Sequence, residues 1–317
     1  MEGGIVSGPV VAVFAGGVSR EKEISVRSAG FVTEALMAFY PVEVFEILSE
    51  KVPSGIDANR HVVFSTLHGT FGEDGGMQGL LDAKGVHYAG SDAESSRLCM
   101  NKEDTKQRVR EGGVVVPRGK FFPVDALPPV GEIVEQLGER LVVKPNGEGS
   151  SIGLQIIDGA DELEKRLKLL DSGEWLVEER IEGRELTVGV LDGDAMGVVE
   201  IMPVSGRYDY ESKYTSGRTR YRAPAEIPEP LSGAIREAAQ TAFDCCGCRD
   251  FARVDFILGD DGAFYFLEIN TLPGLTGTSL LPMSASCDGL DFKQLAKKLI
   301  MPAIERYRFS KRERRGL

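Results

Sequence analysis

The sequence predicts a multidomain protein that combines α/β and α+β architecture, with a parallel sheet in its N-terminal third. The first hundred residues alternate strand-like and helix-like segments, which is the rhythm of an α/β layer. Two later segments, 186–204 and 252–270, each place an Asp-Gly pair between β-rich flanks, which is typical of antiparallel hairpins. The chain has 317 residues, and single hydrophobic cores stop growing at roughly 250 to 300 residues.

The N-terminal part of the chain, residues 1–100, is predicted to be one α/β domain. Hydrophobic runs predict its strands, and segments at about 24–37 and 77–84 predict helices between them. Strands joined by helical crossovers pair in parallel, so we expect a parallel sheet. The runs predicted as strands are VVAVF, VEVFEI, VVFSTLHG and VHYAG.

A second domain is predicted for residues 101–184. A polar helical stretch, residues 92–111, stops at Gly112-Gly113, where helices commonly end. The runs of strand and helix after this point indicate an α+β unit. The predicted strands are 114–122, 141–144, 154–157 and 175–179, and the predicted helices are 132–137 and 161–170.

The remaining residues, 185–317, contain both hairpins and are predicted to form a third domain on an antiparallel sheet. Between the hairpins, residues 207–227 mix polar and aromatic side chains without a helical or strand period. Long loops of this kind are often lids over active sites. The alternative is a disordered insertion, which the tyrosines of the segment disfavour.

The composition argues against several classes of partner and site. A net charge of −12 disfavours binding to nucleic acid or to anionic lipid. The N-terminus lacks a basic leader, so we expect a cytoplasmic protein that binds no membrane. Five cysteines argue for reduced thiols rather than a disulfide framework. The Cys245-x-x-Cys248 spacing allows a zinc site, but no second Cys or His pair lies nearby, which favours core packing.

A loop rich in glycine and serine, residues 144–153, follows an apolar strand that ends in Lys144. Such a loop offers backbone N–H groups to phosphate oxygens. It is not a Walker A motif, and Ile152 replaces the third glycine of the dinucleotide fingerprint. The loop predicts a phosphate site, with a hairpin turn and a surface lysine as the alternative.

The second hairpin brings oxygen ligands together. A four-residue loop at 260–263 would pair Asp255 with Glu268, and the period of two then places both on one face with Arg253 and Asn270. Two carboxylates and an amide oxygen suit magnesium that carries nucleotide phosphates. The alternative is a solvated sheet face. The predicted core residues of the other face are Val254, Phe256, Leu258, Tyr265, Leu267 and Ile269.

Two further segments lie where strands of the parallel sheet end. Glu21 or Glu23, after the first strand, could hold an ammonium group at the expected ligand crevice. The alternative is that these acidic residues only complement a helix dipole. His68 lies in LHGTFGEDG, whose glycines indicate close backbone approach, although a lone histidine is more often structural.

Together these segments resemble the D-alanine:D-alanine ligase family of ATP-grasp enzymes. The resemblance is carried by GGVSREKEIS, LHGTFGEDG, KPNGEGSSIG, YDYESKY, ARVDF and LEINTLPGLTGTSLLP, and it covers about residues 10–300. It implies a three-domain ATP-grasp fold with an N-terminal Rossmann-like parallel-sheet domain. ATP would lie between the central and C-terminal domains.

The resemblance also implies roles for individual residues in ATP binding. Two magnesium ions, with manganese as the alternative, would be bound by Asp255, Glu268 and Asn270. Glu179 departs from the family, since many relatives have a lysine there, so the adenine contacts differ. The residues expected to bind ATP are Lys102, Lys144 and Lys213 at the phosphates or adenine, Glu178, Arg180 and Ile181 at the adenine, Glu185 at the ribose, and Ser150 and Ser151 in the loop.

The implied reaction transfers the γ-phosphoryl group of ATP to one D-alanine, and the amine of a second D-alanine attacks the acyl phosphate to give the dipeptide used for peptidoglycan. Arg253 and the N–H of Gly274 would stabilise the tetrahedral oxyanion. The other residues implied in substrate binding and closure are Glu21 and His68 at the first substrate, Ser279 and Leu280 at the second, and Ser150 with Tyr214 locking the lid toward Glu21.

Other functions stay open at this point. Another ATP-grasp carboxylate–amine ligase, or one that uses D-lactate, would share the phosphate and metal residues. A non-enzymatic nucleotide-binding regulator would be expected to lack Arg253 or a metal ligand. A Rossmann dehydrogenase would require the glycine fingerprint, which is absent from the first strand–helix turn. The resemblance further implies a homodimer.

Overall fold

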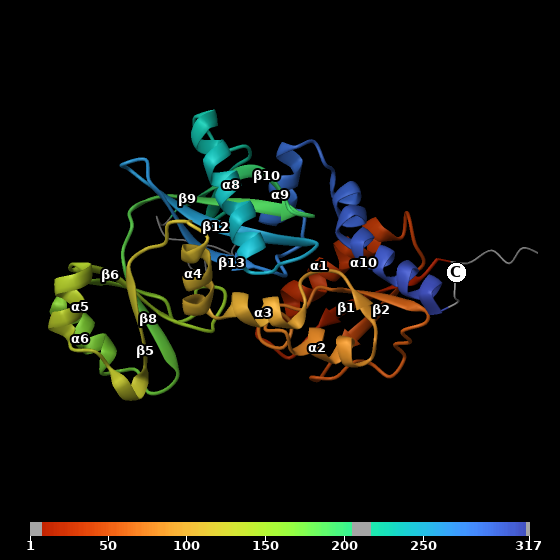
Figure 1. Ribbon diagram of the computed structural model, residues 1–317, viewed down its shortest axis with the longest axis horizontal. Coiled ribbons are helices and arrows are strands. Elements are labelled where there is room, and N and C mark those ends of the chain that lie inside the picture. Colours follow the sequence, from red (N-terminus) through yellow and green to blue (C-terminus); the bar gives the residue numbers. More distant parts are fainter. Residues whose placement is uncertain (1–7, 205–216, 315–317) are drawn as a thin grey trace, which may run out of the picture.

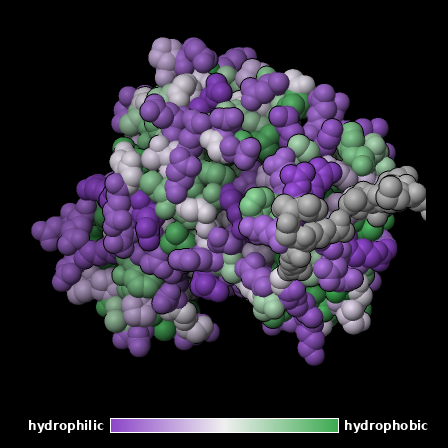
Figure 2. Space-filling view, turned by 45° about the vertical axis from the view of Figure 1, so that its right-hand side comes forward, coloured by the Kyte–Doolittle hydropathy of each residue, from purple (hydrophilic) through white to green (hydrophobic). Residues whose placement is uncertain are grey.

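The computed structural model describes residues 8–204 and 217–314, which form three sheets with helices on their faces (Figure 1). This arrangement confirms the predicted α/β and α+β class. The visible face carries mostly hydrophilic residues with apolar ones interspersed (Figure 2). In the described parts of the chain, no helix has the length and apolar character needed to span a bilayer.

The first sheet is parallel, in the order β2-β1-β3-β4. Its strand β1 is apolar and almost fully buried, as expected for a sheet covered on both faces. The alternation predicted for the first hundred residues is therefore confirmed. Its elements are β1 (Val10–Gly16), α1 (Lys22–Leu36), β2 (Val42–Ile47), β3 (His61–Ser65), α2 (Gly76–Ala83) and β4 (His87–Tyr88).

The helical stretch predicted for residues 92–111 is two helices, α3 (Ala93–Met100) and α4 (Lys102–Glu111), so that prediction was wrong in continuity. Asn101 lies between them with an extended backbone, ψ 106°, and its side-chain oxygen accepts a hydrogen bond from the N–H of Asp104 at 3.0 Å. Asparagine competes with a continuing helix by capping the next one. After the break, α4 packs against the strand Phe264–Asn270 and the helix Glu229–Cys245.

The central sheet is antiparallel, in the order β5-β8-β6-β7. The strand predicted from residue 114 begins only at Gly119. Pro117 has no N–H to donate, and the carbonyl of Val115 accepts from Phe266 of another sheet. The elements are β5 (Gly119–Pro123), a 3-10 turn (Val124–Ala126), α5 (Val130–Leu137), β6 (Arg140–Pro145), β7 (Gln155–Asp158), α6 (Ala160–Leu167) and β8 (Glu174–Glu179).

The third sheet is antiparallel, in the order β11-β10-β9-β12-β13, between helices α8 and α9. Gly189 lets α9 approach closely, because a Cβ there would lie 2.7 Å from Leu281. Both predicted hairpins are confirmed. The elements are β9 (Gly183–Leu191), β10 (Asp194–Pro203), β11 (Thr219–Arg222), α8 (Glu229–Cys245), β12 (Phe251–Gly259), β13 (Phe264–Asn270), α9 (Leu280–Cys287) and α10 (Phe292–Arg314).

The register of β12 and β13 pairs Asp255 with Glu268, as the sequence predicts, but a bulge follows. Beyond it Phe256 pairs with Phe266, so Phe266 is fully buried, and Tyr265 and Leu267 are not. The prediction of Tyr265 and Leu267 as core residues was therefore wrong. A bulge places two residues of one strand opposite one of the other, and here it leaves Leu267 and Glu268 lining the same cleft.

An ion pair ties the first sheet to the third. The buried carboxylate of Asp250, just before β12, receives two hydrogen bonds from Arg306 of α10, at 2.7 and 2.6 Å. Arg306 also donates to the carbonyl of Tyr88, and the N–H of Gly90 donates to Asp250 at 2.9 Å. Helix α10 therefore connects the first sheet to the third across their junction (Figure 1).

Replacing Arg306 with methionine should destabilise the protein by about 2–3 kcal/mol, because the buried Asp250 carboxylate would lose its charged donor. Urea unfolding measures this change in the free energy of unfolding. Arg308→Met, an exposed neighbour on the same helix, serves as the control and should leave the free energy of unfolding almost unchanged. Equal midpoints for the two variants would contradict the assignment.

Candidate active site

Two adjoining cavities lie where the three sheets meet. One, of about 970 Å³, lies between the central and third sheets, and the other, of about 550 Å³, is shared by the first and third sheets and the glycine loop. Lys102 and Glu268 line both. The two cavities therefore adjoin at these two residues and form a two-part site.

The predicted residues gather in these cavities. Only Lys213 and Tyr214 lie outside the described residues. The larger cavity is lined by Lys102, Lys144, Ser151, Glu178, Arg180, Ile181, Glu185, Asp255 and Glu268. The smaller cavity is lined by Glu21, His68, Lys102, Ser150, Arg253, Glu268, Asn270, Gly274, Ser279 and Leu280.

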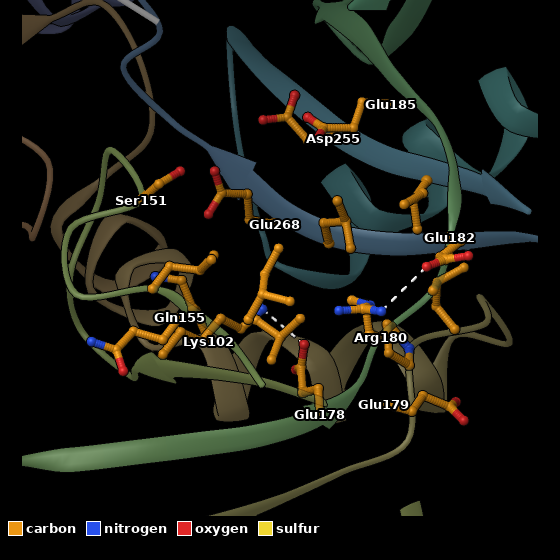
Figure 3. A pocket seen from close by; sticks show the side chains of 18 of the residues that line it. Lys102, Ser151, Gln155, Glu178, Glu179, Arg180, Glu182, Glu185, Asp255 and Glu268 are labelled. Carbon is orange, nitrogen blue, oxygen red and sulfur yellow. Dashed lines mark hydrogen bonds and ion pairs between the residues drawn. The ribbon is translucent and has the colours of Figure 1, made fainter. Parts of the chain in front are cut away.

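In the larger cavity, Glu178 lies in the cleft wall opposite Asp255 and Glu185 (Figure 3). Glu178 as a whole residue is 3% exposed. Its carboxylate binds the ammonium groups of Lys106 and Lys144. Although burial raises the pKa of Glu178, the two lysines lower it to about 2. Glu178 is therefore an anion held between two cations.

The two lysines respond differently to this burial. Burial lowers the pKa of Lys106 to about 7, helped by the like charge of Lys144 and opposed by Glu178. The pKa of Lys144 is raised, because the attraction of Glu178 outweighs burial. Sequence reasoning missed Lys106. The available signal was its spacing, since it lies one helical turn after Lys102 on α4.

The hinge between β8 and β9 is held by ion pairs on both sides. Arg180 donates to Asp158 of β7 and to Glu182, each at 3.3 Å. Glu179 points away from the cleft (Figure 3), and its carboxylate binds the backbone N–H and side chain of Arg118. Glu179, the departure from the family pattern, thus lines the larger cavity while its carboxylate is held by Arg118.

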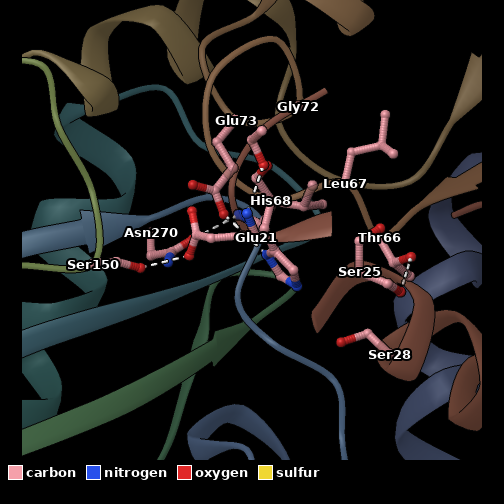
Figure 4. Close-up of polar contacts among 12 residues, drawn as sticks. Glu21, Ser25, Ser28, Thr66, Leu67, His68, Gly72, Glu73, Ser150 and Asn270 are labelled. Atoms are coloured by element: carbon pink, nitrogen blue, oxygen red, sulfur yellow. Dashed lines mark hydrogen bonds and ion pairs between the residues drawn. The ribbon is translucent and has the colours of Figure 1, made fainter. Parts of the chain in front are cut away.

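The glycine loop reaches across to the first sheet. Ser150 and Ser151 both adopt left-handed backbone conformations, with φ of 52° and 57°. The hydroxyl of Ser150 donates to Glu21 at 2.5 Å, joining residues 129 positions apart (Figure 4). Lys102 also donates to the carbonyl of Glu148. The loop is thereby held over the smaller cavity.

Glu21 belongs to a compact acidic and histidine group. His68 is 6% exposed, and its Nδ1 lies 3.1 Å from Glu73 (Figure 4). Burial raises the pKa of Glu73, against the lowering effect of His68. Gly69 between them has φ 76°, and a Cβ there would lie 2.9 Å from Ser19. Glu73 was also missed, although it stands in the glycine-rich segment that singled out His68.

The face of the second hairpin carries the predicted oxygen ligands. Arg253 binds both oxygens of Asp255, at 2.9 and 2.7 Å, and Thr187 donates to Asp255 at 2.5 Å. The side-chain oxygen of Asn270 accepts from the N–H of Leu272 at 3.0 Å. Two carboxylates and one amide oxygen fit a hard divalent cation. Binding a cation at Asp255 requires its pairing with Arg253 to loosen.

The far end of the smaller cavity is formed by the start of α9. Ser279 precedes the helix, and its hydroxyl accepts from the N–H of Thr276 at 2.9 Å. Gly274 packs against it, since a Cβ there would lie 3.0 Å from the Ser279 hydroxyl. Unpaired N–H groups at a helix start favour anions, so this end suits a carboxylate.

Three of the cysteines are buried in the core, and one of them, Cys99, also lines the smaller cavity. Cys99, Cys246 and Cys248 are buried within one hydrophobic cluster against α8. The Sγ atoms of Cys99 and Cys248 are 3.6 Å apart. The positions of Cys246 and Cys248 therefore agree with core packing.

Known proteins match the chain over most of its length. The model of the family described as D-ala D-ala ligase C-terminus matches residues 125–301. A D-alanine–D-alanine ligase of Methylacidiphilum infernorum is 40% identical over 299 residues, covering 92% of this chain and 94% of the relative. One from Aquifex aeolicus is 40% identical, covering 92% of this chain and 99% of the relative.

Solved structures give the same result. A Bacillus anthracis D-alanine–D-alanine ligase superimposes with a TM-score of 0.83 at 31% identity, covering 95% of this chain and 99% of that one. A D-Ala:D-Ser ligase from Enterococcus faecalis gives 0.82 at 30% identity, covering 94% and 100%. The family model matches more than half of the chain, and the relatives match it along nearly their whole length. The chain therefore belongs to the D-alanine–D-alanine ligase family.

Proposed function

We propose that this protein uses ATP to join two D-alanine molecules into D-alanyl-D-alanine for peptidoglycan synthesis. The observation that carries the proposal is the two-part site, in which Glu268 and Lys102 line both cavities. A phosphate bound beside Glu268 in the larger cavity would face a carboxylate bound in the smaller one. Phosphoryl transfer requires this direct approach of the two groups.

The larger cavity supplies the nucleotide contacts in this proposal. Lys144 and Lys102 would neutralise phosphate charge, Glu178 and the hinge would meet the adenine, and Glu185 the ribose. Magnesium or manganese at Asp255, Glu268 and Asn270 would offset the charge of the phosphates during transfer. The lid lysine and tyrosine expected to close the site, Lys213 and Tyr214, lie outside the described residues.

The smaller cavity supplies the amino-acid contacts. Glu21 and the adjacent His68 would bind the ammonium group of the first D-alanine, and the start of α9 the carboxylate of the second. Arg253 and the N–H of Gly274 would stabilise the oxyanion that forms when the amine attacks the acyl phosphate. The contact of Ser150 with Glu21 supports a loop that excludes water from this intermediate.

The remaining parts of the proposal concern organisation and location. We assign residues 1–100 to the domain on the amino-acid side, 101–184 to the central nucleotide-binding domain, and 185–317 to the domain that carries the metal ligands. We propose that the enzyme acts in the cytoplasm, where ATP is supplied. Exposed apolar residues on α1 and at its C-terminal cap support a homodimer: Val26 and Met37 are 47% and 66% exposed, and lie about three helical turns apart on one face.

With D-alanine as the sole amino acid, ATP and magnesium should give phosphate and a dipeptide in equal amounts. L-alanine should give neither, and D-lactate or D-serine added to D-alanine should leave the D-alanine dipeptide as the main product. Phosphate release and mass spectrometry of the products measure this. Turnover only with another acid–amine pair would keep an ATP-dependent ligase and refute the substrate.

Glu268→Gln should lower kcat by more than about a hundredfold while the protein stays folded, because one metal-binding oxygen is replaced by an amide donor. The measurement is ADP release at saturating magnesium and again at saturating manganese. Asp260→Asn, at the exposed turn of the same hairpin, is the matched control and should retain the wild-type rate. A wild-type rate for Glu268→Gln would refute the metal assignment.

A homodimer predicts twice the mass of one chain in sedimentation velocity at micromolar concentration. Met37→Asp should shift this species toward the monomer, because burial of a charge at an apolar contact is unfavourable. Lys51→Asp, an exposed change outside α1, should leave the dimer intact. A monomer for the wild type would refute the proposed assembly.

A further inference from the structure

Lys106 lies directly behind the wall of the larger cavity. It projects from α4 and is only 2% exposed, although it is a lysine. Lys106 faces Glu178 of β8 and Lys144 of β6. These two residues line the cavity itself. Burial of an ammonium group is unfavourable unless the group has a partner. Among the described ion pairs, Lys106 binds one carboxylate, that of Glu178, which offsets the cost of its burial.

The geometry divides the carboxylate of Glu178 between two cations. Lys106 binds Oε1, whereas Lys144 binds Oε2 at 2.8 Å. One oxygen is held from helix α4 and the other from strand β6. The carboxylate therefore cannot rotate without losing one charged contact. The orientation of Lys144 depends in turn on the same carboxylate.

We propose that Lys106 is a positioning residue of the nucleotide site, which fixes the carboxylate of Glu178 and, through it, the ammonium group of Lys144. The inference rests on the proposed function, because it assumes that ATP binds in the larger cavity. Lys106 does not line the cavity. It acts through two residues that do line it.

The charges of the cluster favour the same role. Because burial lowers the pKa of Lys106 to about 7, the cluster carries a net positive charge when this lysine is protonated, and that charge suits a polyphosphate. Loss of Lys106 would leave a neutral pair of Glu178 and Lys144, and would free one oxygen of Glu178 to turn. Nucleotide binding should therefore weaken, while the amino-acid cavity on the other side of Glu268 should be unaffected.

Helix α4 has other attachments, so the role of Lys106 can be separated from folding. The N–H of Lys102 donates to the carbonyl of Asn146 at 3.1 Å, and the N–H of Glu103 to its side chain at 2.9 Å. Val109 on the same helix is fully buried. These contacts should keep α4 in place after a substitution at Lys106.

The test compares Lys106→Met with Arg110→Met. Methionine retains the apolar stem of lysine without its charge, and Arg110 is an exposed cation of the same helix. Lys106→Met should raise the KM for ATP about ten- to a hundredfold, as expected for loss of a charged hydrogen bond. The KM for D-alanine should change less than about twofold, and Arg110→Met should resemble the wild type throughout.

Binding of ATP without amino acid, measured by calorimetry, separates this inference from the proposed function. A wild type that binds ATP but makes no dipeptide would refute the function, and weaker ATP binding by Lys106→Met would still support the inference. Equal ATP affinity of the wild type and Lys106→Met would overturn it. Should Lys106→Met fail to fold, Lys106→Gln and Lys106→Arg replace it. The inference requires weaker ATP binding by Lys106→Gln and restored ATP binding by Lys106→Arg. Equal ATP affinities of these two variants overturn it.

Discussion

The site depends on the register between β12 and β13. Pairing of Asp255 with Glu268 puts both carboxylates on the face that borders the cavities, and a slip of one residue would turn them into the core. The bulge after this pair keeps the aromatic residues Phe256 and Phe266 buried while Glu268 stays at the junction of the cavities. Packing of apolar side chains thus sets the position of the polar ones.

A second constraint is the burial of charge between α4 and the central sheet. Lys106, Glu178 and Lys144 are all at least nine-tenths buried, and Glu178 is the anion that stabilises the charge of each lysine. This cluster fixes the base of the larger cavity. Because its members come from α4, β6 and β8, the position of the first helix of the central unit and the shape of the nucleotide cleft are coupled.

The smaller cavity and the junction beside it are also assembled from segments far apart in the sequence. Ser150 of the glycine loop meets Glu21 near the start of α1, and Arg306 of α10 meets Asp250 before β12. Neither contact follows from local propensity, since the partners are 129 and 56 positions apart and loop closure over such separations gives no periodic signal. The pairing of Arg253 with Asp255 was likewise not predicted. For Arg253 to act at an oxyanion, a bound substrate must compete with Asp255 for its guanidinium.

Local patterns determined the parallel sheet, both hairpins, the pairing of Asp255 with Glu268, and the types of ligand atom on that face. These follow from periodicity and turn chemistry, which act over a few residues. Tertiary structure decided the late start of β5 at Gly119, because the carbonyl of Val115 pairs with Phe266 of another sheet. The local cap at Asn101 and the bulge at Leu267 also went unpredicted, because strand and helix periods do not show single-residue interruptions. Tertiary structure also decided that Lys106 and Glu73 belong to the site, since burial and charge pairing exist only once the sheets have packed together.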